Sequence, residues 1–115
     1  TVITGVNPGS EILREEIFGP VLSITTFTDE ADAVAKANDT EYGLVSYVYT
    51  QDFARGQRLI ETLQTGMMGL NVGVVSNAAA PFGGMKQSGV GREGGFEGIH
   101  EYLETKYVLT PNPFA

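Results

Sequence analysis

Two strand-like segments with a helical segment between them lie within residues 44–72, and this arrangement constrains the fold most. The first, LVSYVYT at 44–50, is rich in β-branched and aromatic residues, and the second, MMGLNV at 67–72, is a short apolar run. Between them, Asp52 can cap a helix and Gly66 can end it. The apolar face of this helix is formed by Leu59, Ile60 and Leu63. Because so short a crossover forces parallel pairing, we predict that segments 44–50 and 67–72 are parallel.

The remaining segments extend the same α/β pattern. The stretch PVLSITTF at 20–27 alternates and predicts a strand over 21–27, and Thr28-Asp29 then offers an N-cap for a helix over 31–38. Residues 96–104 have a short helical pattern, and residues 106–110 resemble a last strand. We therefore expect a partial three-layer α/β domain, with one parallel sheet formed by segments 21–27, 44–50 and 67–72 and with residues 106–110 outside it.

Length, charge and the scarcity of reactive side chains exclude several function classes. The 115 residues suffice for one domain at most, and the net charge of −7 argues against nucleic acid or an anionic membrane surface as a partner. No apolar run approaches the roughly 20 residues of a membrane span and no signal peptide is visible, so we expect a cytoplasmic protein. There is no cysteine, and the single histidine, His100, cannot form a two-histidine site, so we expect no thiol nucleophile and no metal in this chain.

A glycine-rich stretch at 80–95, APFGGMKQSGVGREGG, contains a match to the dinucleotide-binding spacing G-x-G-x-x-G at Gly89 to Gly94. That function needs a strand before the glycines, a helix after them and an acidic residue about twenty positions later. Residues 83–88 have no apolar or β-branched run, and about twenty positions beyond the glycines the chain is almost finished, at Pro111. We therefore interpret the stretch as a long irregular loop whose glycines permit positive φ angles, and not as a phosphate cradle.

The position of this loop still predicts a binding site. It follows segment 67–72, and ligands of open α/β sheets bind beyond the carboxyl ends of the strands. The connection carries Ser76, Asn77 and Phe82, which offer two small hydrogen-bonding groups and an aromatic wall for a small polar ligand. Ordinary turn formation is the alternative role for Ser76 and Asn77, and the residues taken alone favour it.

A second candidate patch is the acidic and aromatic segment Glu15-Glu16-Ile17-Phe18. Neighbours in an extended segment point to opposite faces, so only one of the two carboxylates can face a given site. Glu16 and Phe18 are two positions apart and would share a side, where they could hold a sugar diol and a flat ring. The alternative is a solvated acidic pair before a turn.

Five stretches together resemble the C-terminal part of the aldehyde dehydrogenase superfamily in their order and spacing. They are EEIFGPVLSITTF, NDTEYGL, TGMMGLNVG, APFGGMKQSGVGREGG and YLETKYV. The resemblance covers essentially the whole chain, and the ordered set is specific although each motif alone is modest. The segment GVVSNAAAPFGGMKQSGVGREGG followed by EYLETKY is most similar to the succinate-semialdehyde dehydrogenase branch.

The resemblance implies the catalytic-domain fold of an NAD(P)-dependent enzyme that oxidises a small aldehyde, with succinate semialdehyde as the expected substrate. Glu16 matches the family's glutamate that hydrogen-bonds the nicotinamide ribose, and Phe18 matches the aromatic beside the nicotinamide. Phe82 matches an aromatic at the aldehyde funnel, and Ser76 matches a serine that helps to hold the distal carboxylate of the substrate. Residues 106–110 resemble the strand that joins an oligomerisation sheet of a neighbouring subunit, which implies a homo-oligomer.

Departures from the family pattern limit what this segment can do alone. The family's cysteine nucleophile, oxyanion-stabilising asparagine, general-base glutamate and nucleotide domain have no counterpart here, and Glu16 is not the general base. We expect residues 1–104 to be the C-terminal part of a catalytic domain and residues 105–115 to be an oligomerisation strand and tail. Two alternatives stay open, a stand-alone module that binds a small ligand through the glycine loop and a non-catalytic interaction fragment that pairs through its last strand.

Overall fold

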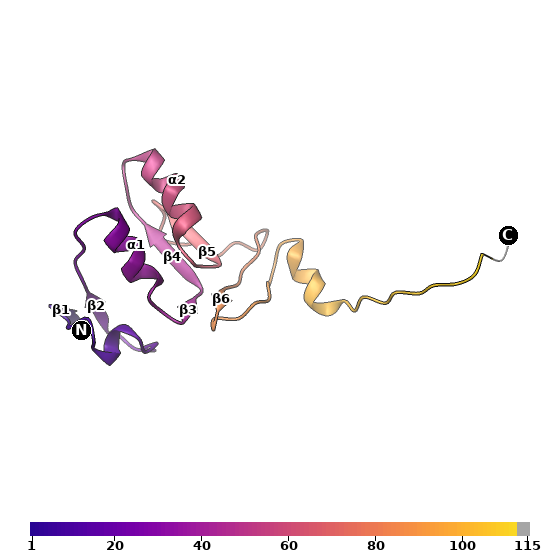
Figure 1. The fold of residues 1–115 in the computed structure, drawn as a ribbon, viewed down its shortest axis with the longest axis horizontal. Helices are drawn as coiled ribbons and strands as arrows, with labels where there is room; N and C mark the ends of the chain where they lie inside the picture. The colour runs from indigo at the N-terminus through magenta and orange to yellow at the C-terminus, as the bar shows by residue number, and fades with distance from the viewer. Residues whose placement is uncertain (113–115) are drawn as a thin grey trace.

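The computed structural model describes residues 1–112 of the chain and contains short strands, two α-helices and two 3-10 helices (Figure 1). The strands are β1 (Val2–Thr4), β2 (Leu22–Ile24), β3 (Tyr42–Gly43), β4 (Val45–Val48), β5 (Met67–Leu70) and β6 (Met85–Lys86). The α-helices are α1 (Glu30–Asn38) and α2 (Phe53–Thr62), and the 3-10 helices are η1 (Glu11–Leu13) and η2 (Glu97–Tyr102). The predicted α/β class with parallel strands is confirmed.

The crossover β4–α2–β5 has the predicted topology. β4 and β5 pair in parallel, with Val45 opposite Met67 and Val48 opposite Leu70. The Asp52 carboxylate caps α2 by accepting a hydrogen bond of 3.1 Å from the backbone N–H of Arg55. The helix therefore starts where the sequence places it, and its short loops bring β5 beside β4.

The predicted single sheet is wrong. Leu22 to Ile24 of β2 pair in parallel with Val2 to Thr4 of β1, while β4 and β5 form a separate two-stranded sheet. β1 is only three residues long and was not predicted, so the actual partner of β2 was missing from the predicted sheet. Between these parts lies α1, which Asp29 caps through the backbone N–H of Asp32 at 2.9 Å, in agreement with the predicted N-cap.

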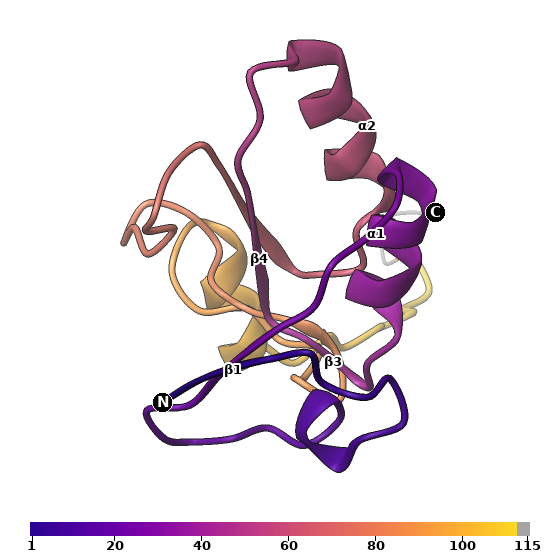
Figure 2. The same ribbon diagram turned by 90° about the vertical axis from the view of Figure 1, so that its left-hand side faces the viewer.

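The described chain leaves its apolar faces uncovered. Among residues 1–112 no hydrophobic side chain is buried. The only buried residues of this part are five glycines, Gly43, Gly56, Gly69, Gly84 and Gly98. The accessible surface is 9147 Å², against about 6,100 Å² for a compact monomer of this mass. The radius of gyration is 19.8 Å, where a compact domain of this length has about 13 Å. α1 and α2 lie side by side on one side of β4, and η2 lies beyond the other (Figure 2).

The C-terminal part of the chain projects away from the rest (Figure 1). The short helix expected over 96–104 is present as the 3-10 helix η2. Residues 103–112 are exposed and have no helix or strand, so the strand expected over 106–110 does not form within this chain. This segment does lie outside the sheets, as predicted, and residues 113–115 of the expected tail are outside the described residues. Neither α1 nor α2, the α-helices of the described part, is long and apolar enough to span a bilayer.

Candidate functional site

The carboxyl ends of β4 and β5 are fixed by the side chain of Asn71. Its amide accepts a hydrogen bond from Thr50 N and donates one to Thr50 O, both at 2.9 Å. Asn71 itself adopts a positive φ of 56°, and its backbone N–H donates to Val48 O at 2.7 Å. Asparagine tolerates this conformation better than most residues, so Asn71 both ends β5 and directs the chain into the connection that carries Ser76 and Phe82.

Two glycines outside the loop, Gly43 and Gly66, allow neighbouring backbone segments to come into direct contact. A β-carbon placed on Gly66, at the start of β5, would overlap Gly83 O and would lie 2.6 Å from Gly84 Cα. A β-carbon on Gly43 in β3 would lie 2.7 Å from Gln64 O. Both distances are shorter than real β-carbon contacts. Gly66 is therefore required where the loop packs against the start of β5, and Gly43 where β3 packs against the backbone of Gln64.

The geometry at Gly89 to Gly94 favours packing over phosphate binding. Contrary to the sequence interpretation, a strand does precede these glycines, but β6 has two residues and pairs antiparallel with β3. The helix that follows is the six-residue 3-10 helix η2, and its Glu101 carboxylate accepts a hydrogen bond of 3.4 Å from Arg92 N. A carboxylate on a loop N–H repels the phosphate that a dinucleotide loop must attract, so the motif match does not carry that function.

Phe82 is held by the loop and lines an open cavity. Its backbone N–H and C=O pair with those of Glu93, with both hydrogen bonds at 2.7 Å. The residue is 36% exposed, so part of its ring is available to a ligand. The cavity has a volume of about 740 Å³, and its other lining residues include Leu44, Arg92, Ile99 and Tyr102. Ser76, Glu16 and Phe18 do not line it.

Ser76 and Asn77 differ in their surroundings. The Asn77 side chain accepts a hydrogen bond of 2.9 Å from Ala79 N, and its carbonyl accepts one of 3.0 Å from Ala80 N, which is ordinary turn chemistry. Ser76 is exposed, and its hydroxyl forms no hydrogen bond with any other residue of the described part of the chain. Asn77 therefore shapes the turn, and the Ser76 hydroxyl is accessible to a ligand.

Glu16 and Phe18 lie in an exposed irregular segment between η1 and β2. The Phe18 ring is 94% exposed, and Glu16 is exposed as well. The charge of Glu41 raises the pKa of Tyr42, with smaller contributions from partial burial and from Glu16 and Glu15. This chain alone does not bring Glu16 and Phe18 into the cavity that Phe82 lines.

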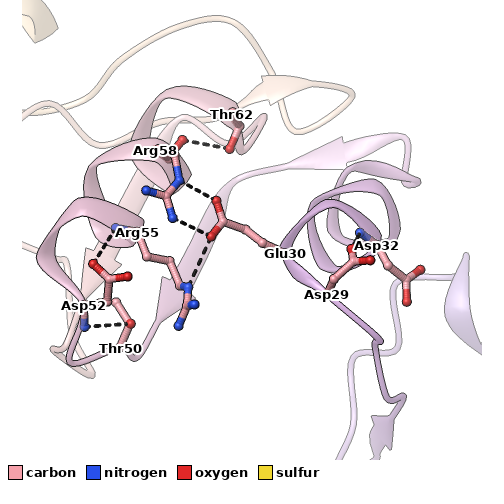
Figure 3. A network of polar contacts seen from close by, with 8 residues as sticks. All are labelled: Asp29, Glu30, Asp32, Thr50, Asp52, Arg55, Arg58 and Thr62. Carbon is pink, nitrogen blue, oxygen red and sulfur yellow. Dashed lines mark hydrogen bonds and ion pairs between the residues drawn. The ribbon is translucent and has the colours of Figure 1, made fainter.

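An ion-pair network joins α1 to α2 (Figure 3). The Glu30 carboxylate accepts hydrogen bonds from Arg58 Nε at 2.7 Å, from Arg58 Nη2 at 2.8 Å and from Arg55 Nε at 3.2 Å. These contacts, with the hydrogen bond from Arg58 as the main cause, lower the pKa of Glu30 to about 2. The network supports the helix of the crossover, and nothing in the spacing of these residues predicted it.

Within residues 1–112 no group of three or more histidine, cysteine, aspartate or glutamate side chains is arranged to hold a metal ion. Sequence reasoning also missed two residues that shape the loop, Asn71 and Lys86, both of which have positive φ angles. A positive φ at a residue other than glycine leaves no reliable signal in a single sequence.

A sequence profile described as "Aldehyde dehydrogenase family" matches residues 1–108. The chain belongs to the aldehyde dehydrogenase family. Solved members of the family share its fold. A crystal structure of an aldehyde dehydrogenase from Brucella melitensis biovar abortus 2308 is 50% identical and superimposes with a TM-score of 0.86, covering 93% of this chain and 22% of that one.

Curated relatives of this aldehyde dehydrogenase segment include several semialdehyde dehydrogenases. A succinate-semialdehyde dehydrogenase from Paenarthrobacter nicotinovorans is 54% identical over 99% of this chain and 25% of its own length. A non-phosphorylating aspartate-semialdehyde dehydrogenase from Halomonas elongata is 51% identical over 93% of this chain and 22% of its own length. The chain thus spans about a quarter of the length of the relatives it matches.

Members of the family similar to this chain use NAD or NADP. The NADP(+) succinate-semialdehyde dehydrogenase GabD from Escherichia coli is 48% identical over 94% of this chain and 22% of its own length. A betaine aldehyde dehydrogenase from Staphylococcus aureus, solved in complex with NAD+, is 43% identical with a TM-score of 0.87, covering 91% of this chain and 21% of that one. These relatives use the cofactor class that the sequence resemblance implies.

Proposed function

We propose that this chain is the C-terminal catalytic-domain part of an NAD(P)+-dependent aldehyde dehydrogenase that oxidises an aldehyde with a distal carboxylate. Succinate semialdehyde is the first candidate substrate. The observation that carries the substrate class is the exposed Ser76 hydroxyl, which has no partner in the described chain and follows the carboxyl end of β5. The similarity to succinate- and aspartate-semialdehyde dehydrogenases supports it, because both named substrates combine an aldehyde with a carboxylate.

Glu16 and Phe18 fit the nicotinamide end of the cofactor. NAD(P)+, when bound, supplies the hydride acceptor for aldehyde oxidation. Glu16 offers an exposed carboxylate that can accept hydrogen bonds from ribose hydroxyls, and the exposed Phe18 ring can pack against a flat heterocycle. In this proposal both residues position the cofactor, and neither takes part in bond making.

Ser76 and Phe82 form the far wall of the substrate pocket in this proposal. The Ser76 hydroxyl donates a hydrogen bond to the distal carboxylate, and the partly exposed Phe82 ring contacts the aliphatic stem. This chain contains no cysteine, so it provides no thiol nucleophile and is inactive by itself. Residues 1–112 thus contribute positioning groups, and the reacting nucleophile is not among them.

Residues 105–115 form the proposed oligomerisation segment, and residues 1–104 the proposed catalytic-domain part. The described portion of that segment, residues 105–112, is exposed and contains no strand, so a β-edge of a second copy could pair with it. The cytoplasmic location expected from the sequence stays a prediction, as does the homo-oligomer.

The substrate assignment is tested by Ser76→Ala in the full-length enzyme. We expect kcat/KM for succinate semialdehyde to fall by about tenfold to a hundredfold, because a hydrogen bond to a charged group contributes about 1.5–3 kcal/mol. An aldehyde of similar length without the carboxylate should lose little, since it does not use the hydroxyl. The ratio of the two kcat/KM values is the measurement, and a ratio unchanged within about twofold would refute the role of Ser76.

A further inference from the structure

Lys86 has an unusual backbone conformation in the centre of the glycine loop. Its φ is 56°, in the left-handed region that side chains with a β-carbon rarely adopt. Lys86 is also the second residue of β6 and lies opposite Tyr42 of β3. A conformation of this kind persists only where the surrounding contacts enforce it, and the contacts of the Lys86 side chain show what holds it.

The Lys86 ammonium binds the carbonyl end of α1. Nζ donates to Asn38 O at 2.9 Å and to Thr40 O at 3.0 Å, and the residue is half-buried. Asn38 is the last residue of α1. The last carbonyls of a helix lack partners within it and carry partial negative charge, so a half-buried ammonium stabilises this helix end and fixes the loop against it.

Asn38 connects the same point to α2. Its side-chain amide donates to Thr62 O, the last residue of α2, at 2.9 Å, and its side-chain oxygen accepts from Gln64 N at 2.9 Å. The carboxyl-terminal ends of α1 and α2 therefore meet at one residue, and Lys86 joins the glycine loop to it. The position of the loop is therefore fixed relative to both helices.

Lys86 and Phe82 are joined by the short segment 82–86, whose backbone is held in place by hydrogen bonds. β6 begins at Met85, directly after Gly84, whose carbonyl accepts a hydrogen bond of 2.7 Å from Arg92 Nη1. The next residue after Arg92 is Glu93, which pairs with Phe82 by two hydrogen bonds of 2.7 Å. Both ends of segment 82–86 are thus held, one by Glu93 and the other by the contact of Lys86 with α1.

We propose that Lys86 is a positioning residue for the aldehyde substrate. Its ammonium fixes the glycine loop on the carboxyl-terminal end of α1, and this contact sets where the Phe82 ring stands in the substrate pocket. The inference rests on the proposed role of Phe82 and adds to it the residue that determines the placement of that ring. Lys86 does not touch the substrate.

The test is Lys86→Met in the full-length enzyme, which keeps nearly the length of the side chain but removes the ammonium. We expect KM for succinate semialdehyde to rise about tenfold while kcat changes by less than about threefold, because a displaced wall removes binding common to ground and transition states. Lys86→Arg should restore KM to within about threefold of the original value. Lys36→Met is the matched control, since Lys36 Nζ also binds a carbonyl, Thr26 O at 2.9 Å, and the carboxylate of Asp32, but does not contact the loop.

A lower melting temperature for Lys86→Met with an unchanged KM would overturn the proposal and leave Lys86 with a structural role only. An equal rise in KM for Lys36→Met would overturn it as well. If Lys86→Met is insoluble, Lys86→Asn replaces it, because asparagine tolerates positive φ but cannot reach α1. Phe82→Ala separates the two proposals. An unchanged KM in that variant refutes the role of Phe82, whereas a raised KM there with an unchanged one in Lys86→Met refutes only the role of Lys86.

Discussion

The crossover β4–α2–β5 and the C-terminal segment 103–112 contain similar strand-forming residues and have different structures. LVSYVYT at 44–50 and KYVLT at 106–110 are both rich in valine, leucine, tyrosine and threonine. The first forms β4, paired with β5 over four residues, and the second forms no strand in this chain. The difference is the partner. Each residue of β4 pairs with the β5 residue 22 positions later in the same chain, whereas no strand of the described residues pairs with 106–110.

The two segments differ in their backbone hydrogen bonds and in the exposure of their side chains. The crossover is closed by backbone hydrogen bonds at both ends, from Met67 N to Leu44 O at 3.1 Å and from Asn71 N to Val48 O at 2.7 Å. Tyr107 and Leu109 in the other segment are more than four-fifths exposed, and an extended segment with exposed apolar side chains is suited to pairing with another β-edge. The crossover thus finds its strand partner within the chain, whereas residues 106–110 pair with no strand of the described residues.

The largest effect on stability is expected for Gly66→Ala, which disturbs the crossover where the glycine loop packs against β5. A β-carbon at Gly66 overlaps the backbone of Gly83, and neither backbone can move without disturbing β5 or the glycine loop. We expect a loss of about 3 kcal/mol in the free energy of unfolding, at the upper end for overpacking. The measurement is urea unfolding of the full-length enzyme followed by circular dichroism.

The control for this variant is Gly9→Ala. A β-carbon at Gly9 would meet only Asn7 Oδ1, at 3.7 Å, which is an ordinary van der Waals contact. Gly9→Ala should therefore unfold at nearly the urea concentration of the original protein. Equal stability of Gly66→Ala and Gly9→Ala would contradict the close packing of the loop on β5.

A smaller effect is expected for Glu30→Gln, which removes the link between α1 and the helix of the crossover. The pKa of Glu30 is lowered to about 2 from an ordinary value of about 4.5, so its contribution to stability is complete above about pH 4.5 and is lost as the pH falls toward about 2. Glu30→Gln should therefore melt a few degrees below the original protein at pH 6 and at nearly the same temperature at pH 2. The effect is small because both partners are partly solvated.

Glu61→Gln is the matched control on α2, because Glu61 forms no ion pair within the described part of the chain. Its melting temperature should stay close to that of the original protein at both pH values. A difference between Glu30→Gln and the original protein that persists unchanged at pH 2 would show that the carboxylate charge is not what stabilises the link.

The sequence predicted those features that depend on residues close together in the chain. Asp29 and Asp52 cap their helices as expected, and the length of the connection determined the parallel pairing of β4 with β5. The pairing of β2 with β1 was missed because β1 is only three residues long. Features that join distant residues, such as the contact of Lys86 with Asn38, depend on the folded arrangement and leave no local pattern.

The candidate site was predicted less completely than the fold. The position of the loop beyond the carboxyl end of β5 follows from parallel topology, and Phe82 does line a cavity. Glu16 and Phe18 were singled out by their spacing and given their cofactor roles through family resemblance, and the described chain does not bring them into that cavity. Their roles, like that of Ser76, concern ligands, so backbone patterns could not determine them.

Amide hydrogen exchange on the 115-residue chain tests the central comparison most directly. We expect slow exchange for the amides of Met67 and Asn71, which donate to Leu44 O and Val48 O, respectively. Residues 106–110 should exchange at the rate of an unstructured peptide. Equal protection of the two segments, or no protection of Met67 and Asn71, would contradict the claim that the crossover contains its own partner and that the C-terminal segment does not.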